Sequence, residues 1–479
     1  MDPSELDLPE GVVEEARACL DESIMTYRGE PVGTVAARDR RHEPVNYHHC
    51  FVRDFVVSAL VFLQEGRPEI VRNFLSLIVD LQSRKESLNC FDPGRGLLPA
   101  SFLVRRVNGD EEIEVDFGEH AIARVTPIDS AFWWLWLLRV YTRATGDRTL
   151  VEQEETQHAI RLVVEFSLRA QAELLPTILV PDGAFMIDRR MGVYGHPLDV
   201  QVLFVGALRA AHEMLGDDDP TGKAARHRLG HLVHHLRTYY WIDFAALNEL
   251  YRYPVEEYGK GVINHFNVYP ESIPEWLAPW LPDEGGYYAA NLGPGRKDFR
   301  FLAQGNLLSL VFGLADDGHA KALLDLIAQR WDDLVGNMPM KLLWPALEDE
   351  EWARTTGHDA KNRPWSYHNG GSWPCLLWQL GAAATRGNRE SMLHRALEIA
   401  ARRIAADDWP EYYDTPRGRL VGRQARLRQT WTAAGFLCGW NLVRDPSFAD
   451  HLGFDTPIAD VTCSGPADLS ARADPLRED

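Results

Sequence analysis

Lysine is scarce in this chain. Seven of its 50 basic residues are lysine, so arginine supplies almost all of the positive charge. Acidic residues number 70, and the formal net charge is -20. A protein with that charge repels nucleic-acid phosphates and anionic lipid headgroups. The composition therefore argues against a general nucleic-acid binder or a membrane-surface binder.

Several marks of other protein classes are also missing. The six cysteines form no CxxC pair and no spacing typical of zinc sites, which predicts reduced and mostly buried thiols. His48-His49 has no third ligand at helical spacing, so we expect no metal. No phosphate-binding glycine loop, G-x-S-x-G elbow or dinucleotide fingerprint occurs, and we expect no cofactor.

The chain also lacks targeting and membrane segments. Its first residues, Met1 to Asp7, are acidic and contain no apolar signal region. No apolar run approaches the roughly 20 residues that cross a bilayer. We therefore expect a soluble, cytoplasmic protein without membrane partners. We also expect a homo-oligomer, of a size that the sequence does not give.

What the sequence does contain is a repeated order of helices. The polar motif Tyr47–Asp54 precedes an apolar helix expected over Phe55–Leu63, and an amphipathic helix over Glu69–Leu81 follows. The same order returns along the chain, and most of the apolar helices are followed by an amphipathic one. The six apolar helices are expected over 55–63, 131–145, 200–215, 302–314, 375–385 and 432–442.

Helices that are apolar on every side must be buried on every side. Six of them predict the inner ring of an all-α (α/α)6 toroid, with the amphipathic helices outside and the polar motifs together at one end. Stacked helical hairpins are the alternative, but they would leave one face exposed, and Phe132–Leu138 has no polar face. We expect an N-terminal arm with one short helix over 1–30, a catalytic domain over 31–445 and a mobile polar tail over 446–479.

The loop Pro181–Pro197 holds the first candidate catalytic group, Asp188. It follows three apolar residues and precedes Arg189 and Arg190, so its carboxyl is either desolvated or held by a guanidinium. A glycosidase needs an acid tuned in this way, opposite a second carboxylate. A salt bridge that stabilises a long loop would explain the same residues.

Glu411 is the second candidate, because aromatic rings surround it in Trp409–Asp414. Flat rings pack against the faces of sugars, although an aromatic turn would look the same. Arg53, Asp54 and Asp129 lie where helices begin and could hold sugar hydroxyls; helix capping also explains Asp129. The motif Tyr367–Pro374 joins polar and aromatic residues to a glycine pair, and a helix-entry turn is its simpler explanation.

These motifs resemble the neutral/alkaline invertase family, glycoside hydrolase family 100, over Ala16–Val443. The matching segments are Phe51–Phe55, Pro93–Phe102, Asp116–Glu119, Met186–Met191, Gly195–Pro197, Trp331–Val335, Pro364–Pro374 and Trp409–Asp414. The resemblance implies an (α/α)6 barrel that hydrolyses sucrose with inversion and without a metal. It also implies that Asp188 is the general acid and Glu411 the general base.

We expect a set of residues around these carboxylates to bind the sugar. They are Arg53, Asp54, Asp129, Arg189, Arg190, His196, Gln201, Tyr367, His368, Trp373 and Arg426. Three other functions stay open: hydrolysis of another α-glucoside, an inverting phosphorylase, and a sugar-binding relative without catalysis. The presence of both candidate carboxylates disfavours the last.

Overall fold

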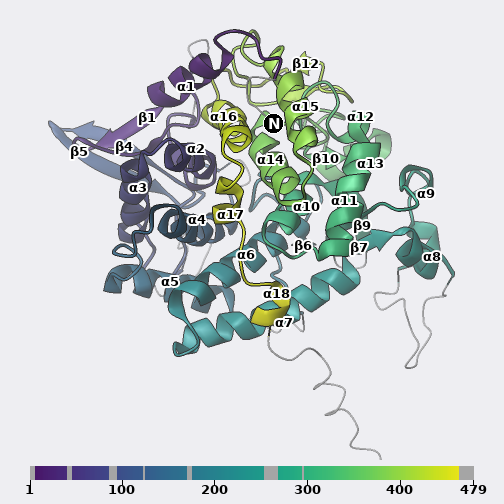
Figure 1. The fold of residues 1–479 in the computed structure, drawn as a ribbon, viewed down its shortest axis with the longest axis horizontal. Helices are drawn as coiled ribbons and strands as arrows, with labels where there is room; N and C mark the ends of the chain where they lie inside the picture. Colours follow the sequence, from purple (N-terminus) through teal and green to yellow (C-terminus); the bar gives the residue numbers. More distant parts are fainter. Residues whose placement is uncertain are drawn as a thin grey trace, which may run out of the picture.

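The computed structural model describes residues 6–39, 46–85, 94–121, 124–169, 175–252, 268–293 and 296–462. Within these ranges, six helices form a closed inner ring (Figure 1). They are α2 (Val52–Gln64), α4 (Asp129–Thr145), α6 (Leu198–Leu215), α10 (Ala303–Val311), α14 (Leu377–Arg386) and α16 (Thr430–Arg444). Each packs against the next in chain order, and α16 packs against α2. The predicted (α/α)6 toroid is confirmed.

The inner helices are buried as their composition requires. In α4, every residue from Asp129 to Tyr141 is buried. The outer helices bury one face only, as in α3, where Ile70, Phe74 and Leu77 are buried. The outer ring consists of α1 (Val12–Glu22), α3 (Pro68–Asp80), α5 (Glu154–Ser167), α7 (Pro220–Tyr239), α11 (Asp317–Gln329) and α15 (Glu390–Ala401).

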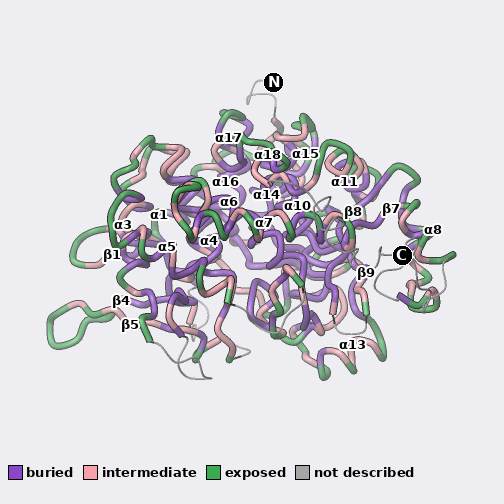
Figure 2. Tube along the Cα trace, turned by 90° about the horizontal axis from the view of Figure 1, so that it is seen from below, coloured by how far each residue is buried: buried purple, intermediate pink, exposed green. Residues whose placement is uncertain are grey.

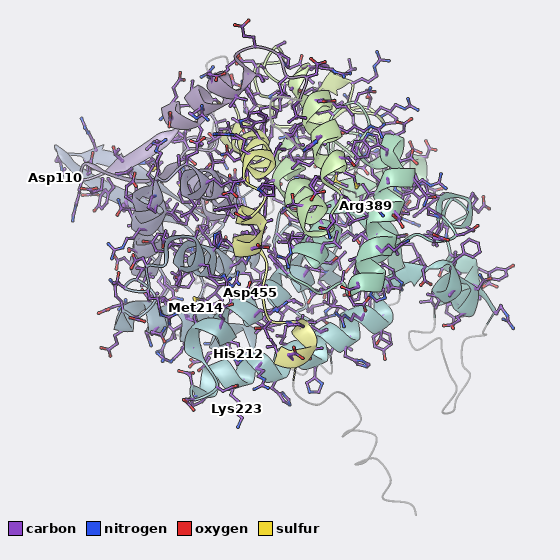
Figure 3. The ribbon with its side chains drawn as sticks, viewed as in Figure 1. Asp110, His212, Met214, Lys223, Arg389 and Asp455 are labelled. Carbon is purple, nitrogen blue, oxygen red and sulfur yellow. The ribbon has the colours of Figure 1, made fainter. Side chains whose placement is uncertain are left out.

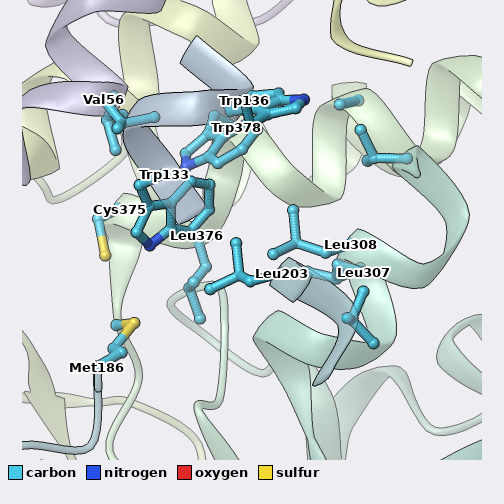
Figure 4. Packing of buried hydrophobic residues seen from close by; sticks show 14 of the residues in the cluster. Val56, Trp133, Trp136, Met186, Leu203, Leu307, Leu308, Cys375, Leu376 and Trp378 are labelled. Atoms are coloured by element: carbon cyan, nitrogen blue, oxygen red, sulfur yellow. The ribbon is translucent and has the colours of Figure 1, made fainter. Parts of the chain in front are cut away.

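Three tryptophans pack against one another beside aliphatic side chains of the buried core (Figure 4). Trp136 of α4 stacks on Trp378 of α14, with ring centroids 5.6 Å apart. Trp133 contacts both rings edge-on, and Phe312 lies 5.5 Å from Trp136. These rings join α4, α14 and the C-terminal end of α10 inside the ring.

The N-terminal segment belongs to the ring. Helix α1 packs against α16, and Ser23 bonds Thr430 through their hydroxyls at 2.8 Å. The short helix expected in the N-terminal arm is therefore present as α1, and it packs into the ring as the outer partner of the last inner helix.

The C-terminal segment is also more ordered than expected. Residues 446–462 form α17 (Phe448–Leu452) and α18 (Ile458–Val461), and Phe448, Leu452 and Phe454 are buried. They cover one end of the toroid, while β4 (Ser101–Val107), β5 (Asp110–Asp116) and α13 (Asp349–Thr356) lie at the other (Figure 2). The rest of the expected tail, 463–479, lies outside the described residues.

Short strands lie at the N-terminal ends of three inner helices. β3 (Cys50–Phe51) runs into α2, β6 (His196–Pro197) into α6, and β9 (Arg296–Leu302) into α10. β3 pairs with β4 (Ser101–Val107), which forms a hairpin with β5 (Asp110–Asp116) in the register Ser101↔Asp116. β8 (Gly286–Gly293) joins β6, β7 (Trp241–Asp243) and β9, and β10 (Leu343–Trp344) pairs with β9. These pairings fix where the inner helices start.

The remaining elements are small. They are β1 (Ile24–Tyr27), β2 (Glu30–Thr34), β11 (Tyr413–Asp414), β12 (Leu420–Val421), α8 (Phe244–Arg252), α9 (Leu277–Trp280), α12 (Trp331–Leu334) and two single-turn 3-10 helices, Pro270–Ser272 and Pro374–Leu376. None of the helices in the described ranges combines the length and apolar composition needed to cross a lipid bilayer. The thiols of Cys19, Cys50, Cys375 and Cys438 are free and buried; Cys90 and Cys463 lie outside the described residues.

Candidate active site

The site begins with an ion pair between two inner helices. At the start of α2, the Arg53 guanidinium bonds both carboxylate oxygens of Asp129 of α4, at 2.6 and 3.1 Å. Asp129 is fully buried, and the bidentate geometry holds the guanidinium in one orientation. Two predicted site residues therefore lie together, bonded to each other.

Asp188 lies in the loop between α5 and α6, which is held by its own side chains. The Asp182 carboxylate accepts hydrogen bonds from the backbone N–H groups of Met191 and Gly192 at 3.0 and 2.9 Å. Phe185 and Ile187 are fully buried and anchor the loop in the core. Asp188 lies between these anchored positions, so the loop holds its backbone in a defined place.

The surroundings of Asp188 favour its protonated form. Burial raises the pKa of Asp188 to about 6, against the lowering effect of Arg53 and Lys361, and the charge of Glu411 raises this pKa as well. The Tyr367 hydroxyl lies 3.5 Å from its Oδ1, and His368 Nδ1 lies 3.8 Å from the same oxygen. A carboxyl with such a pKa can hold a proton and release it near neutral pH.

Glu411 has a tyrosine hydroxyl and a lysine beside it. Its Oε1 accepts a hydrogen bond from the Tyr47 hydroxyl at 3.0 Å, and Lys361 Nζ lies 3.8 Å from Oε2. The backbone of Glu411 also pairs with that of Arg426, with N to O at 2.8 Å. A hydroxyl donor and a positive charge therefore lie beside this carboxyl. The structure therefore brings the two predicted catalytic carboxyls into one site with different partners.

Lys361 is a site residue that the sequence reasoning missed. Its Nζ lies 3.8 Å above the Tyr367 ring, and its charge acts on both Asp188 and Glu411. Two features of the sequence could have indicated it: lysine is rare in this chain, and Lys361 lies just before the motif Pro364–Pro374. Tyr47 was missed in the same way, although it opens the first polar motif.

A cluster of aromatic rings lies against the two carboxyls. Trp373 stacks on His368 and on Tyr412, with centroids 5.3 and 5.6 Å apart, and its indole N–H bonds the Tyr367 carbonyl at 3.0 Å. Burial, together with the charges of Lys361 and Arg189, lowers the pKa of His368 well below its usual value, so this ring is neutral. The cluster gives the site a rigid, uncharged side.

Asp54 is a third carboxyl in the site. Burial raises its pKa to about 7, with a lowering contribution from Arg53 and raising contributions from Glu411 and Asp188. The negative charges of these two neighbours make ionisation of Asp54 less favourable. Asp54 is thus an acid that could donate a hydrogen bond to a ligand oxygen.

The other predicted site residues lie in several places. Arg189 forms a bidentate pair with Asp359, at 2.6 and 3.0 Å, and the Arg426 guanidinium lies 5.2 Å from the Tyr47 ring centre. Both amide atoms of Gln201 bond the backbone of Ile178 at 2.9 Å. These contacts give Arg189 and Gln201 roles in holding the chain.

Within the described ranges, Arg190 and His196 make no hydrogen bond or ion pair with either candidate carboxyl. The charge of Arg190 acts on Asp182. His196 lies in β6, where its N–H bonds Asn291 at 2.9 Å and its buried Nδ1 has no partner in the described part of the chain. Across the described ranges, no group of three or more His, Cys, Asp or Glu side chains is arranged to hold a metal ion.

Sequence comparison finds similar proteins along almost the whole chain. "Neutral/alkaline invertase 3, chloroplastic" of Oryza sativa subsp. japonica is 48% identical and covers 93% of this chain and 75% of its own length. "Cytosolic invertase 1" of the same organism is 47% identical, with 93% and 80% covered. "Alkaline/neutral invertase C, mitochondrial" of Arabidopsis thaliana is 47% identical, with 92% and 68% covered.

Solved structures with the same fold are more distant in sequence. A wild-type glycosidase is 14% identical with a TM-score of 0.56, covering 94% of this chain and 99% of that one. A bacterial glucoamylase in complex with acarbose is 12% identical with a TM-score of 0.54, covering 95% and 57%. The family model described as "Alkaline and neutral invertase" matches residues 16–446. With nine-tenths of its length matched in this way, the chain belongs to the alkaline and neutral invertase family.

Proposed function

We propose that this site hydrolyses the α-glucosidic bond of sucrose with inversion, using Asp188 as general acid and Glu411 as general base. As an invertase-family member, the protein is a glycoside hydrolase that acts on sucrose. The observation that carries the proposed roles is the contrast between the two carboxyls. Asp188 has a raised pKa, and Glu411 has a hydroxyl donor and an ammonium beside it.

In the proposed reaction, protonated Asp188 donates its proton to the glycosidic oxygen as the bond to the glucosyl carbon breaks. Glu411 accepts a proton from the water that attacks this carbon from the opposite face. Inverting glycosidases separate the two carboxyl groups by roughly 6.5–9.5 Å, which leaves room for this water. We expect a separation in that range here. Asp54 and the Arg53–Asp129 pair are proposed to hold sugar hydroxyls.

The anomeric form of the glucose that is first released from sucrose tests whether the reaction inverts. Inversion at an α-glucosidic bond yields β-glucose, so proton NMR of a fresh reaction of the purified protein with sucrose should show the β anomer before mutarotation. Initial release of α-glucose would contradict inversion. A strict requirement for phosphate would identify a phosphorylase instead.

The rate should depend on the protonation of Asp188. Only the protonated acid can donate, so we expect kcat/KM to fall as the pH rises through the pKa of Asp188, about 6. Lys361→Gln removes a positive charge that lowers this pKa. The pKa should then rise, and the descending limb of the pH–rate profile should move to higher pH.

Lys321→Gln is the matched control for that shift. Lys321 is an exposed lysine of α11 paired with Asp325 at 2.7 Å, so its loss should leave the profile unchanged. A limb that stays in place in Lys361→Gln, or moves to lower pH, would show that Lys361 does not act on the acid.

We also predict that catalysis needs no metal ion. Inverting hydrolysis by two carboxylates supplies both proton transfers from side chains. Sucrose hydrolysis after treatment with a chelator should match that of untreated protein. Activity that is lost with the chelator and restored by a divalent ion would contradict this.

A cytoplasmic location and a homo-oligomeric state remain proposals. The similar relatives are named for the cytosol, the chloroplast and the mitochondrion at nearly equal identity. Sequence similarity therefore does not select a compartment. Size-exclusion chromatography with light scattering would measure the oligomeric state.

A further inference from the structure

Three stretches of backbone pair with one another close to the candidate base in the chain. The stretch 340–342 bonds the stretch 371–373 through backbone N–H and carbonyl groups, at 2.8 to 3.4 Å. Ser372 in turn exchanges two backbone hydrogen bonds with Tyr413, at 2.9 and 2.8 Å. Glu411 lies two residues before Tyr413, so its position depends on how firmly these stretches are held together.

Lys341 links the three stretches through its side chain. The residue is 0% exposed. Its Nζ donates hydrogen bonds to the Ser372 hydroxyl at 3.1 Å and to the Thr415 carbonyl at 2.7 Å. The first bond reaches the central stretch, and the second reaches a residue four positions after Glu411. One ammonium group therefore joins its own stretch to both of the others.

Thr415 has a backbone conformation that needs such support. Its φ is 82°, in the left-handed region that β-branched residues rarely occupy. Strained residues of this kind persist only where neighbouring groups hold them. The Lys341 ammonium bonds the Thr415 carbonyl, and the Trp365 carbonyl accepts a hydrogen bond from the Thr415 N–H at 2.9 Å. Both backbone polar groups of this residue are thus fixed by other segments.

The charge of Lys341 makes the residue costly to bury. Burial lowers the pKa of Lys341 to about 7, with a raising contribution from the charge of Asp414. Asp414 itself pairs with Arg363 at 2.8 Å. An apolar side chain of similar length would fill the same space without the cost of a buried charge. What the ammonium supplies, and an apolar side chain does not, is the pair of hydrogen bonds to Ser372 and Thr415.

We propose that Lys341 is a positioning residue for the general base, holding the stretch after Glu411 against the stretch that carries Trp373. The inference rests on the proposed role of Glu411. Within the described ranges Lys341 makes no hydrogen bond or ion pair with either candidate carboxyl, so it acts through the backbone from Tyr413 to Thr415. Because the base must meet the attacking water in a defined geometry, a displaced carboxylate lowers the rate more than it weakens substrate binding.

Lys341→Met keeps the approximate length of the side chain but removes both hydrogen bonds. We expect kcat on sucrose to fall roughly 10- to 100-fold with KM changed by less than about twofold, since a misplacement of about 1 Å can cost that much. The loss should persist on α-glucosyl fluoride, as expected for a defect in the base. An unchanged kcat in folded Lys341→Met would overturn the inference and leave the role of Glu411 intact.

A double-mutant cycle distinguishes positioning from a purely structural role. If Lys341 acts through Glu411, adding Lys341→Met to Glu411→Gln should lower the rate by less than about twofold. The azide-supported rate on α-glucosyl fluoride is the signal to compare, because azide needs no base. The same fold-loss in both backgrounds would overturn the inference. Near-parental activity of Glu411→Gln by itself would overturn the proposed base, and this inference with it.

Two other lysines provide matched controls for the substitution. Lys297→Met removes a partly buried lysine whose Nζ bonds the Tyr239 carbonyl at 2.7 Å and whose pKa burial also lowers to about 7. Lys223→Met removes an exposed lysine of α7, labelled in Figure 3. Both variants should keep the parental kcat. A loss in Lys297→Met as large as that in Lys341→Met would overturn the inference.

Ser372→Ala keeps the test decisive if Lys341→Met does not fold. It removes one of the two hydrogen bonds of the ammonium and leaves the bond to Thr415 in place. We expect kcat to fall roughly threefold, the size of one modest hydrogen bond, and the loss to vanish in the Glu411→Gln background. A kcat equal to that of the parent would overturn the inference.

Discussion

Asp188→Asn should slow sucrose hydrolysis by about 10²–10⁴-fold, the usual contribution of one general acid. The amide keeps the shape of the side chain but cannot protonate the glycosidic oxygen. Steady-state kinetics on sucrose measure the loss, and circular dichroism checks that the variant is folded. Since burial raises the pKa of Asp188, its ionised form destabilises the fold at high pH, so the amide should leave folding intact.

A second substrate distinguishes the loss of the general acid from a general loss of activity. α-Glucosyl fluoride has a leaving group that needs little protonation, so Asp188→Asn should recover much of its rate on this substrate. Asp325→Asn on the outer helix α11, where Asp325 pairs with Lys321, should match the parent on both substrates. Equal losses on sucrose and on the fluoride would mean that Asp188 is not the acid.

Glu411→Gln should also lose about 10²–10⁴-fold on sucrose, because an amide cannot accept the proton of the attacking water. Its loss should persist on α-glucosyl fluoride, where water must still be activated. Added azide is a nucleophile that needs no deprotonation, so we expect it to restore part of the rate. The opposite behaviour of the two variants on the fluoride distinguishes base from acid.

Glu348→Gln is a matched control for the base. Glu348 accepts a hydrogen bond from the Trp365 indole at 2.7 Å and contacts neither candidate carboxyl in the described structure, so its loss should have little effect. A folded Glu411→Gln variant that hydrolysed sucrose near the parent rate would refute the assignment. Asp414, which pairs with Arg363 at 2.8 Å, and Asp54 would then be tested next.

The family resemblance, more than the composition, led to the two carboxyls. Apolar residues on every side of Phe132–Leu138 were enough to predict a buried inner helix, because burial follows from local periodicity. Six such helices were enough to predict the toroid. The arginines after Asp188 and the aromatic residues around Glu411 then indicated these two carboxyls as catalytic candidates. The structure adds the surroundings of each carboxyl: burial raises the pKa of Asp188, and Tyr47 and Lys361 lie beside Glu411.

The sequence by itself thus determined the inner helices, most of the outer ones and the loops that carry the carboxyls. Only the tertiary structure decided which distant residues meet. It placed α1 against α16 as the last outer helix, Tyr47 against Glu411 across 364 positions, and Arg209 beside Thr456. Helical periodicity acts over a few residues, whereas ring closure and the pairing of charges depend on contacts between segments far apart in the chain.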